Sequence, residues 1–353
     1  MILVSFLATA ERASAAIVFR SAQSATSGIL ASSLAITKPT GLVAGDVMVA
    51  TTSIVGTGAI TAPAGWTAIT NTTQGSAIRQ FSWYKVAGAS EAASYTFGLP
   101  LASEASGGIV AYSGVETSNP LNVFGTANGA SGNAVAPSVT TTYPNAMVIV
   151  AVSFARNTTV TPAALTTERY DRAGGVSNEA ADVSQGVQGA TPTRTAVPAN
   201  ATAAWIAHTI ALNEIPELTA TFPSAYAWGS WLIGANSSSD QIATVISNRA
   251  WGVKIKSDRV DGRMMEWNGT SYVSRTLVNP LNWRLTQLGG VAQSTSFAPI
   301  SSTPATVVTA RTPSSTSVQL NVRYSLDVTY ADDAELGANV YRLLVTYDSA
   351  QGF

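Results

Sequence analysis

The residues that could perform acid–base chemistry in this chain are few. His208 is its only histidine, and it has no cysteine. A general base or an imidazole metal ligand would have to be His208, since proton transfer near neutral pH relies mainly on this residue type. His208 falls within an apolar run that predicts a strand, and no second histidine or thiolate is present to complete a zinc site. We therefore expect a structural histidine, no catalytic residues, no cofactor and no metal site.

Two acidic clusters have the spacing of oxygen ligands. Asp332, Asp333 and Glu335 form the denser cluster, and Asp258 and Asp261 form a smaller one. Hard oxygen ligands of this kind could bind calcium. Both clusters also fall where a turn between strands is expected, and aspartate favours turns for its own reasons. Whether the turn at 332–335 binds calcium is left open.

Aromatic residues are concentrated in the last third of the chain, where they could form a platform on which a sugar ring stacks. Tryptophan is equally a common core residue of β-sandwiches, and the core interpretation is favoured for any single ring. The candidates are Tyr226, Trp228, Trp231, Trp251, Trp267, Tyr272 and Trp283. Trp228 and Trp231 lie too close in sequence to share one face of a strand, so one of them should be exposed.

Composition excludes several classes of function. The chain has 353 residues, 46% of them hydrophobic and 11% charged, and its net charge is −1. This balance provides enough apolar surface for folded domains and argues against disorder. No basic stripe is present to neutralise phosphates, which disfavours nucleic-acid binding. No apolar run reaches the 18 or so residues that a membrane span needs.

Residues 16–215 contain a faint internal repeat. Residues 47–50 (VMVA) are matched by 147–150 (MVIV), and residues 61–67 by 161–166, in both cases about 100 residues later. Residues 107–112 are matched by 203–208 at an offset of 96, which aligns His208 with Tyr112. Two like sets of antiparallel strands facing each other predict a jelly-roll-like β-sandwich. The strand at 147–152 is apolar on both faces, so it is either central and covered on both sides or part of a subunit interface.

The character of the chain changes near Pro216, which predicts a junction between two domains. The 137 residues after it contain five of the eight tryptophans. Alternation becomes regular there, with one face of residues 317–330 apolar from Val318 to Tyr330. A strand of that length could bend between two sheets. Residues 251–255 alternate in the same way, and a last strand is expected at 339–347. These patterns predict that residues 216–353 form a smaller immunoglobulin-like β-sandwich.

The N-terminal residues 1–15 form the third predicted segment. Residues 1–10 (MILVSFLATA) are apolar, but no basic residue precedes the apolar part as it would in a signal peptide. We therefore interpret 1–15 as an apolar arm that precedes a first strand at 16–21. An exposed apolar arm is unfavourable in water, so it should dock either along its own sandwich or as an added strand on a neighbouring subunit. Its removal is expected to leave both sandwiches folded.

Several short motifs of residues 16–215 resemble a β-sandwich module found in tail, fibre and decoration proteins of tailed bacteriophages and in secreted bacterial surface proteins. The motifs are 38–39 (KP), 44–47 (AGDV), 62–66 (APAGW), 84–88 (YKVAG), 108–115 (GIVAYSGV) and 119–120 (NP). The likeness covers more than half of the chain and carries no catalytic residues. Residues 217–353 are more loosely similar to immunoglobulin-like modules of virion and bacterial surface proteins.

The resemblance implies a non-enzymatic structural protein of the virion: a capsid decoration protein, a fibre subunit or a tail component. Its partners would be further copies of itself, with a trimer as the first guess, and other virion proteins such as major capsid or tail proteins. A host-surface glycan is a further possible partner. The alternatives are an exported bacterial adhesin or filament subunit, at the cell surface or outside the cell, and a carbohydrate-binding module. The sandwich fold alone does not decide between them.

Overall fold

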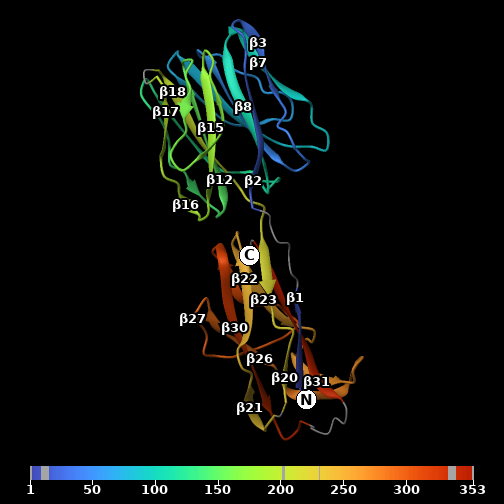
Figure 1. Ribbon diagram of the computed structural model, residues 1–353. Helices are drawn as coiled ribbons and strands as arrows, with labels where there is room; N and C mark the ends of the chain where they lie inside the picture. The colour runs from blue at the N-terminus through green and yellow to red at the C-terminus, as the bar shows by residue number, and fades with distance from the viewer. Residues whose placement is uncertain (1, 9–15, 201–202, 230, 333–338, 352–353) are drawn as a thin grey trace. The chain divides into compact units, whose positions relative to one another are not determined.

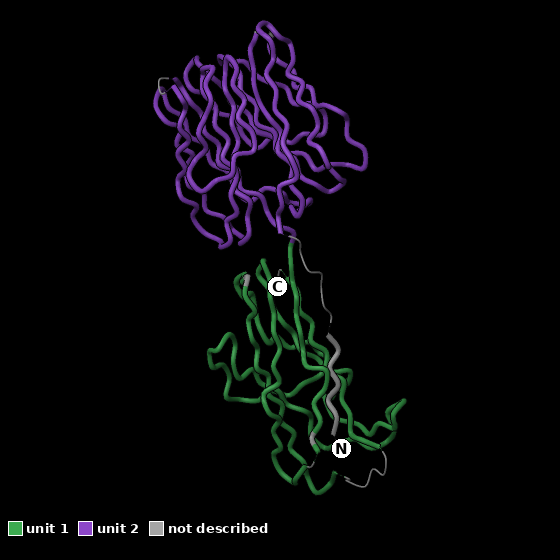
Figure 2. Tube along the Cα trace, in the orientation of Figure 1, with its two compact units in different colours: residues 1–13, 216–353 green, residues 14–215 purple. Residues whose placement is uncertain are grey.

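The computed structural model describes residues 2–8, 16–200, 203–229, 231–332 and 339–351 (Figure 1). Every regular element among them is a β-strand, so the predicted all-β class is confirmed. The chain divides into two compact units (Figure 2), of which unit 2 comprises residues 14–215. Unit 1 comprises residues 1–13 together with 216–353. The chain therefore begins in unit 1, builds unit 2, and returns to unit 1 at Pro216. No helix long and apolar enough to cross a membrane occurs in the described part of the chain.

The first half of unit 2 is a five-stranded antiparallel sheet with a two-stranded sheet packed on it. The larger sheet has the order β2-β8-β4-β6-β5, and the smaller one pairs β3 with β7. The first of these strands starts at Val18 rather than at the predicted residue 16. The strands are β2 (Val18–Thr26), β3 (Ala31–Thr37), β4 (Val47–Val55), β5 (Thr67–Gln74), β6 (Ile78–Val86), β7 (Ser94–Ser103) and β8 (Ala105–Ser113).

The second half repeats the five-stranded sheet strand for strand. Its larger sheet has the order β9-β18-β12-β15-β14, and smaller sheets are formed by β10-β17-β13 and β11-β16. The strands are β9 (Leu121–Gly129), β10 (Ala134–Ala136), β11 (Thr140–Thr141), β12 (Ala146–Phe154), β13 (Val160–Thr161), β14 (Thr167–Arg172), β15 (Ser177–Gln185), β16 (Gly189–Ala190), β17 (Arg194–Pro198) and β18 (Trp205–Leu212).

Strand register confirms the predicted repeat. Val47 of β4 pairs with Tyr112 of β8, and Met147 of β12 pairs with Leu212 of β18, so both strands are shifted by 100 residues. Two β-bulges recur as well. In the strand at one edge of the five-stranded sheet, one extra residue forms a bulge at Arg20 of β2 and again at Asn122 of β9. In the strand at the opposite edge, a bulge lies at Ile69 of β5 and again at Arg169 of β14. Because bulges are specific irregularities of a backbone, their recurrence is strong evidence that the two halves have the same fold.

The register also corrects one part of the repeat. With the shift of 100 residues, His208 corresponds to Gly108, whereas the sequence offset of 96 had aligned it with Tyr112. The backbone frame is the same in both halves, but the side chains at this position are not.

Both faces of the central strands are buried, because unit 2 has four layers. One apolar cluster fills the space between the two five-stranded sheets and includes Val49 and Ile149. A second cluster lies between the first large sheet and β3-β7, and a third lies between the second large sheet and β10-β17. The apolar run at 147–152 is therefore a strand covered on both sides within its own unit.

Unit 1 is a sandwich of two seven-stranded sheets. One has the order β20-β1-β31-β23-β29, with β24 beside β31 and β25 beside β24. The other has the order β19-β22-β30-β26-β27, with β21 beside β30 and β28 beside β26. The strands are β1 (Ile2–Ala8), β19 (Leu218–Thr221), β20 (Ala225–Trp228), β21 (Gly234–Ser237), β22 (Gln241–Ser247), β23 (Trp251–Ser257), β24 (Arg263–Trp267), β25 (Tyr272–Pro280), β26 (Asn282–Leu288), β27 (Val291–Ala292), β28 (Ala298–Pro299), β29 (Ala305–Arg311), β30 (Ser314–Val328) and β31 (Val340–Gln351).

The predicted alternation accounts for the core of unit 1. Side chains from Val318 to Val328 on one face of β30 are buried, as are Trp251 and its alternating neighbours on β23. The long strand remains in one sheet and does not bend into the other, because all its partners belong to that sheet. The prediction was wrong for Tyr330, which lies in the turn after β30 and is 91% exposed.

The predicted N-terminal arm is, over residues 2–8, strand β1 of unit 1. It lies between β20 and β31, antiparallel to β20 and parallel to β31. Of the two predicted docking modes, the structure has the strand in its own sandwich. Because β1 fills an internal position of the sheet, its removal should disrupt the sandwich of unit 1, contrary to the expectation from the sequence. Residues 9–15 of the predicted arm lie outside the described residues.

Candidate functional site

His208 is part of the packing between the two halves of unit 2. It is fully buried on β18, with Nδ1 2.8 Å from Oγ of Ser82 and Nε2 3.1 Å from Oγ1 of Thr72. Burial lowers the pKa of the imidazole to about 3, so the ring is neutral near neutral pH. Two hydroxyl groups occupy both ring nitrogens, and this arrangement provides neither a base with access to solvent nor a metal ligand.

The acidic clusters are used as turn formers. Asp332 accepts hydrogen bonds from the backbone N–H groups of Thr329 (2.8 Å) and Val278 (2.7 Å), while Asp333 and Glu335 lie outside the described residues. Asp258 accepts from the hydroxyl of Tyr272, and Asp261 from the backbone N–H of Arg263. Among the described residues, no three acidic or histidine side chains come together in a way that could hold a metal ion.

The structure also contains a buried acid that sequence reasoning missed. Glu179 of β15 is fully buried, and neither carboxylate oxygen has a hydrogen-bond partner. Burial raises the pKa of Glu179 well above its ordinary value, and the nearby Glu168 and Asp171 raise it further. The strand register aligns Glu179 with Phe81 of the first half, which stacks on Trp83. An acid thus replaces an aromatic core residue, and its burial favours the protonated, neutral form of the carboxyl group.

A polar network fixes the two halves of unit 2 to each other. The hydroxyls of Ser53 and Ser153, which are equivalent in the repeat, contact each other at the centre of the unit. Asn178 donates from Nδ2 to both of them and accepts at Oδ1 from the hydroxyls of Tyr170 (2.7 Å) and Thr51 (3.1 Å). A buried network with these bonds made specifies one register between the two sheets.

The aromatic side chains of unit 1 that the structure describes do not form the single platform that the sequence allowed. Trp251 and Trp283 are core residues, and Tyr226 packs against the same core. Trp267 and Tyr272 pack edge to face on the β24–β25 hairpin, with the Arg342 guanidinium 4.2 Å above Trp267. The side chain of Trp228 lies outside the described residues, and Trp231 is half-buried at one end of the unit.

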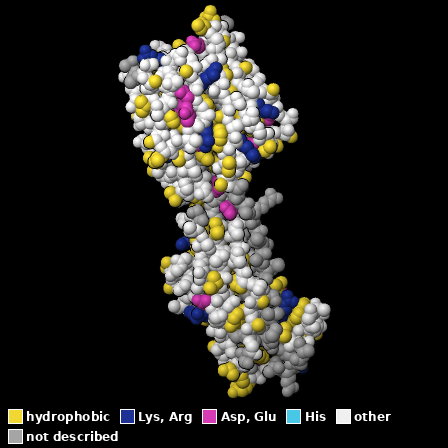
Figure 3. Space-filling model, in the orientation of Figure 1, with side chains coloured by type: hydrophobic (Ala, Val, Ile, Leu, Met, Phe, Trp, Pro, Cys, Tyr) yellow, Lys and Arg dark blue, Asp and Glu magenta, His cyan; other side chains and the backbone are white. Residues whose placement is uncertain are grey.

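That end of unit 1 carries exposed apolar side chains on two adjacent loops. Gly234 of β21 pairs with Val328 of β30, so the loop before β21 and the turn after β30 lie side by side. Leu232 is 77% exposed and Ile233 is 55% exposed on the first loop, and Tyr330 is exposed on the second. Figure 3 shows hydrophobic side chains at the end of unit 1 where β21 lies. We call Trp231, Leu232, Ile233 and Tyr330 the apolar tip.

The apolar tip is held rigidly by side chains of its own loops. Asn236 accepts from the backbone N–H of Leu232 (3.0 Å) and donates back to its carbonyl oxygen (2.7 Å). Asp332 fixes the turn that carries Tyr330 by accepting a hydrogen bond from the backbone N–H of Thr329, and Trp231 packs edge to face on Tyr341. A pocket of about 210 Å³ opens there, lined by Trp231, Ile233, Val328, Thr329, Tyr330 and Asp332. Such preorganisation lowers the entropic cost of binding.

A longer groove lies at the edge of the same sandwich, between the β26–β27 hairpin and β29. Two adjoining hollows of about 270 and 380 Å³ share Leu285, Gln293 and Val307. Arg284 lies in its wall, 4.7 Å above the ring of Phe297, and donates to the carbonyl oxygen of Thr295 (2.6 Å). The rest of the lining is mixed. Its polar part consists of serine and threonine side chains and Arg311, and its apolar part consists of Trp283, Leu288, Val308 and two alanines.

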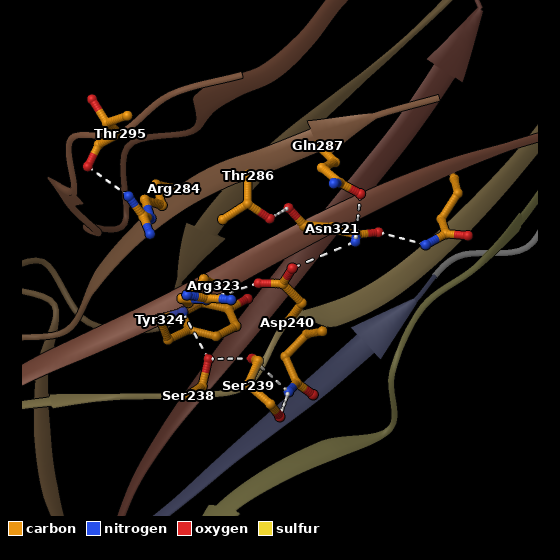
Figure 4. A network of polar contacts seen from close by, with 12 residues as sticks. Ser238, Ser239, Asp240, Arg284, Thr286, Gln287, Thr295, Asn321, Arg323 and Tyr324 are labelled. Atoms are coloured by element: carbon orange, nitrogen blue, oxygen red, sulfur yellow. Dashed lines mark hydrogen bonds and ion pairs between the residues drawn. The ribbon is translucent and has the colours of Figure 1, made fainter. Parts of the chain in front are cut away.

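The polar face of the sheet beside this groove is internally satisfied (Figure 4). The Arg323 guanidinium donates to the carboxylate of Asp240 (2.8 Å). The side-chain amide of Asn321 donates to Gln287, and the backbone carbonyl of Asn321 accepts from the hydroxyl of Thr286. These bonds join β30 to β26 and to the loop before β22, and they leave little free hydrogen-bonding capacity there. The apolar tip and the groove are therefore the better candidates for binding.

Sequence reasoning missed the apolar tip, although one signal was present. Leucine and isoleucine stand at 232–233, in a loop where turn residues are expected, and Asn236 follows at the spacing of a side chain that closes a loop. The chain matches no protein-family model, no curated protein and no solved structure.

Proposed function

We propose that this chain is a non-enzymatic structural protein of a tailed-bacteriophage particle, a capsid decoration protein, fibre subunit or tail component that works through contacts with other virion proteins. The motifs of residues 16–215 that resemble the phage β-sandwich module support this proposal. The burial of His208 and the use of the acidic side chains as turn formers support a role other than catalysis.

The observation that carries the proposal is the apolar tip of unit 1. Monomeric proteins seldom hold several large apolar side chains rigidly exposed, and such patches mark interaction sites. Hydrogen bonds to Asn236 and Asp332 hold the two loops whose side chains Leu232, Ile233 and Tyr330 are exposed. A fixed apolar contact surface is what a subunit of an assembly needs.

Purified particles provide the test. Mass spectrometry should find this chain in particles, and antibody labelling should place it on the head, tail or fibres. The double variant Ile233→Ser with Tyr330→Ser should remain folded and be incorporated less. Val260→Ser, at an exposed residue of another turn, is the matched control. Finding the chain only in the host envelope would favour the bacterial adhesin instead.

Glycan binding is a second candidate function, favoured by the groove between β26 and β29. Its serine, threonine and glutamine side chains with Arg284 and Arg311 could hydrogen-bond sugar hydroxyls. A glycan array with the wild-type chain tests this function. Arg284→Ala and Arg311→Ala should abolish any signal that arises from the groove, while the variant of the apolar tip should retain it.

A further inference from the structure

The groove between the β26–β27 hairpin and β29 lies in a part of the chain that has basic but no acidic residues. No aspartate or glutamate occurs between Glu266 and Asp327, whereas this stretch contains four arginines. Two of them, Arg284 and Arg311, line the groove, and none of the described residues that line it is acidic. The hollows at the apolar tip and at residues 258–261, by contrast, each contain an aspartate. The groove is therefore positively charged, on a chain whose net charge is −1.

The charge of Arg284 is not neutralised by the protein itself. Arg284 stands directly opposite Arg323 in the register of β26 and β30, and like charges in that position repel each other. The carboxylate of Asp240 accepts from Arg323 at 2.8 Å, as Figure 4 shows, but within the described part of the chain Arg284 has no acidic partner. One carboxylate thus serves two arginines on this face of the sheet. The remaining positive charge favours an anion from outside the chain.

The Arg284 side chain is nevertheless held in one position. Its guanidinium lies 4.7 Å above the ring of Phe297, and Nη1 donates to the carbonyl oxygen of Thr295 (2.6 Å). Nη2 has no partner among the described residues and remains for a ligand. A guanidinium that is ordered before binding loses little side-chain entropy when it pairs with an acid group.

Arg311 reaches across the end of the groove from the opposite wall. The register of β23 and β29 contains one extra residue between Val308 and Arg311, and Ala310 has a φ of 39° there, in the left-handed region. A Cβ on Gly289, in the β26–β27 turn, would lie 3.4 Å from Nη2 of Arg311. The bulge therefore accompanies a second guanidinium that lies against the hairpin carrying Arg284. Strained backbone of this kind is concentrated at binding sites.

The rest of the lining suits sugar hydroxyls. Thr306, Thr309 and Thr312 are exposed, and their hydroxyls make no hydrogen bond within the described residues. On the β26 side, two backbone carbonyls already accept from the N–H groups of Gln293 and Ser294. That wall of the groove therefore offers side chains and no free strand edge to a ligand, which favours a sugar over an extended peptide.

We propose that this groove binds an acidic oligosaccharide, with acid groups on two sugar units paired with Arg284 and Arg311 and sugar hydroxyls bound by the threonines. Each of the two adjoining hollows contains one of the arginines. The acid group is a carboxylate or a sulfate, because both match the donors of a guanidinium. The inference rests on the glycan binding proposed above as the second function, and it narrows that function to one class of glycan.

Isothermal titration calorimetry of the full chain with matched tetrasaccharides tests the proposal. The probes are tetragalacturonate, its methyl ester, which has the same rings and no charge, and a sulfated galactose tetrasaccharide. The wild-type chain should bind at least one acidic probe about tenfold more tightly than the neutral ester. Added salt should weaken binding of the acidic probe and leave that of the ester unchanged. The tighter of the two acidic probes identifies the acid group as carboxylate or sulfate.

Arg284→Gln and Arg311→Gln each remove a charge and keep an amide donor. Each should weaken binding of the acidic probe about tenfold and that of the neutral ester much less. Arg172→Gln, at an exposed arginine of unit 2, is the matched control and should leave both affinities unchanged. Thermal melts establish that each variant is folded. Because Arg284 also holds the loop at Thr295, Arg311→Gln keeps the test decisive if Arg284→Gln unfolds.

Three results would overturn the inference, and they separate it from the functions proposed above. Equal affinities for the acidic and neutral probes, insensitive to the substitutions at Arg284 and Arg311, would overturn it and leave glycan binding in place. Binding of none of the tetrasaccharides, together with an empty glycan array, would overturn both. A tetraglutamate peptide that binds as tightly as the acidic probes would also overturn it, because the groove would then select charge and not a sugar.

Discussion

Replacing Glu179→Gln should remove most of the pH dependence of the stability of unit 2. Glutamine has nearly the same shape and no charge, whereas Glu179 must either keep a proton or bury a charge without a partner. Burial raises the pKa of Glu179 in the folded state above the ordinary value of 4.5, and Glu168 and Asp171 act in the same direction. Below pH 4.5 the acid is protonated in both states and the two proteins should have similar stability.

The size of the effect follows from proton linkage. Above pH 4.5 the unfolded chain releases a proton that the folded chain retains. The free energy of unfolding then falls by about 1.4 kcal/mol for each pH unit, until the pH passes the folded pKa and the loss is complete. For each pH unit between 4.5 and the folded pKa of Glu179, the variant should therefore gain about 1.4 kcal/mol relative to the wild type. Glu168 and Asp171, whose pKa values burial also raises, should leave a smaller slope of the same sign.

Urea denaturation at a series of pH values, followed by calorimetry to separate the two units, measures this difference. Glu91→Gln is a control of opposite sign in the same unit. Burial raises the pKa of Glu91, but hydrogen bonds from Lys85, the Gly88 backbone and Tyr95 lower it more, so its net pKa is lowered. Its contribution to stability is present above pH 4.5 and is lost as the pH falls. Equal pH slopes for wild type and Glu179→Gln, or a less stable variant at neutral pH, would refute the reasoning.

Gly108→Ala should lower the free energy of unfolding of unit 2 by about 1–3 kcal/mol, because a Cβ there would lie 2.3 Å from Cζ of Tyr170. Urea melts measure this, with Gly186→Ala, whose Cβ meets open space, as the control. Removing residues 2–8 should lower or abolish the thermal transition of unit 1 and leave that of unit 2 unchanged, since β31 loses its parallel partner; calorimetry that shows two unaltered transitions would contradict it. Asn236→Ala should lower the free energy of unfolding of unit 1 by roughly 1 kcal/mol. It should also make the loop at 231–234 more sensitive to proteases, with little change in the sensitivity of other loops.

Much of the fold could be predicted because alternation and repetition are local properties of the sequence. The apolar runs at 47–50 and 147–150 mark equivalent central strands, and the alternation from Val318 to Val328 marks one buried face. The offset of the third repeat match was wrong because the ring-bearing residue stands at Tyr112 in the first half, whereas in the second half it stands at His208, four positions earlier in the shared frame, and Leu212 takes the place of Tyr112. Only the pairing of backbones shows that His208 stands where the first half has Gly108.

Long-range pairing and loop geometry could not be predicted in the same way. The apolar composition of residues 2–8 indicated that they must be covered, but their partners are more than two hundred residues away in sequence, in β20 and β31. Glu179 follows two other polar residues, and nothing in that run shows that its side chain faces a sealed core. The apolar tip depends on hydrogen bonds from Asn236 and Asp332 to backbone groups, which an alternation pattern does not contain.

The insertion of unit 2 between β1 and the rest of unit 1 imposes an order on synthesis. The ribosome makes β1 before all the other described strands and its parallel partner β31 after them, because β31 starts only at Val340. At typical elongation rates of about 5–20 residues per second, roughly half a minute passes between the synthesis of β1 and that of β31. The sheet that contains both strands cannot close before then. All of unit 2 emerges and can fold during that interval. A chain that stops before Val340 then carries a finished unit 2 and a unit 1 in which β1 has no parallel partner.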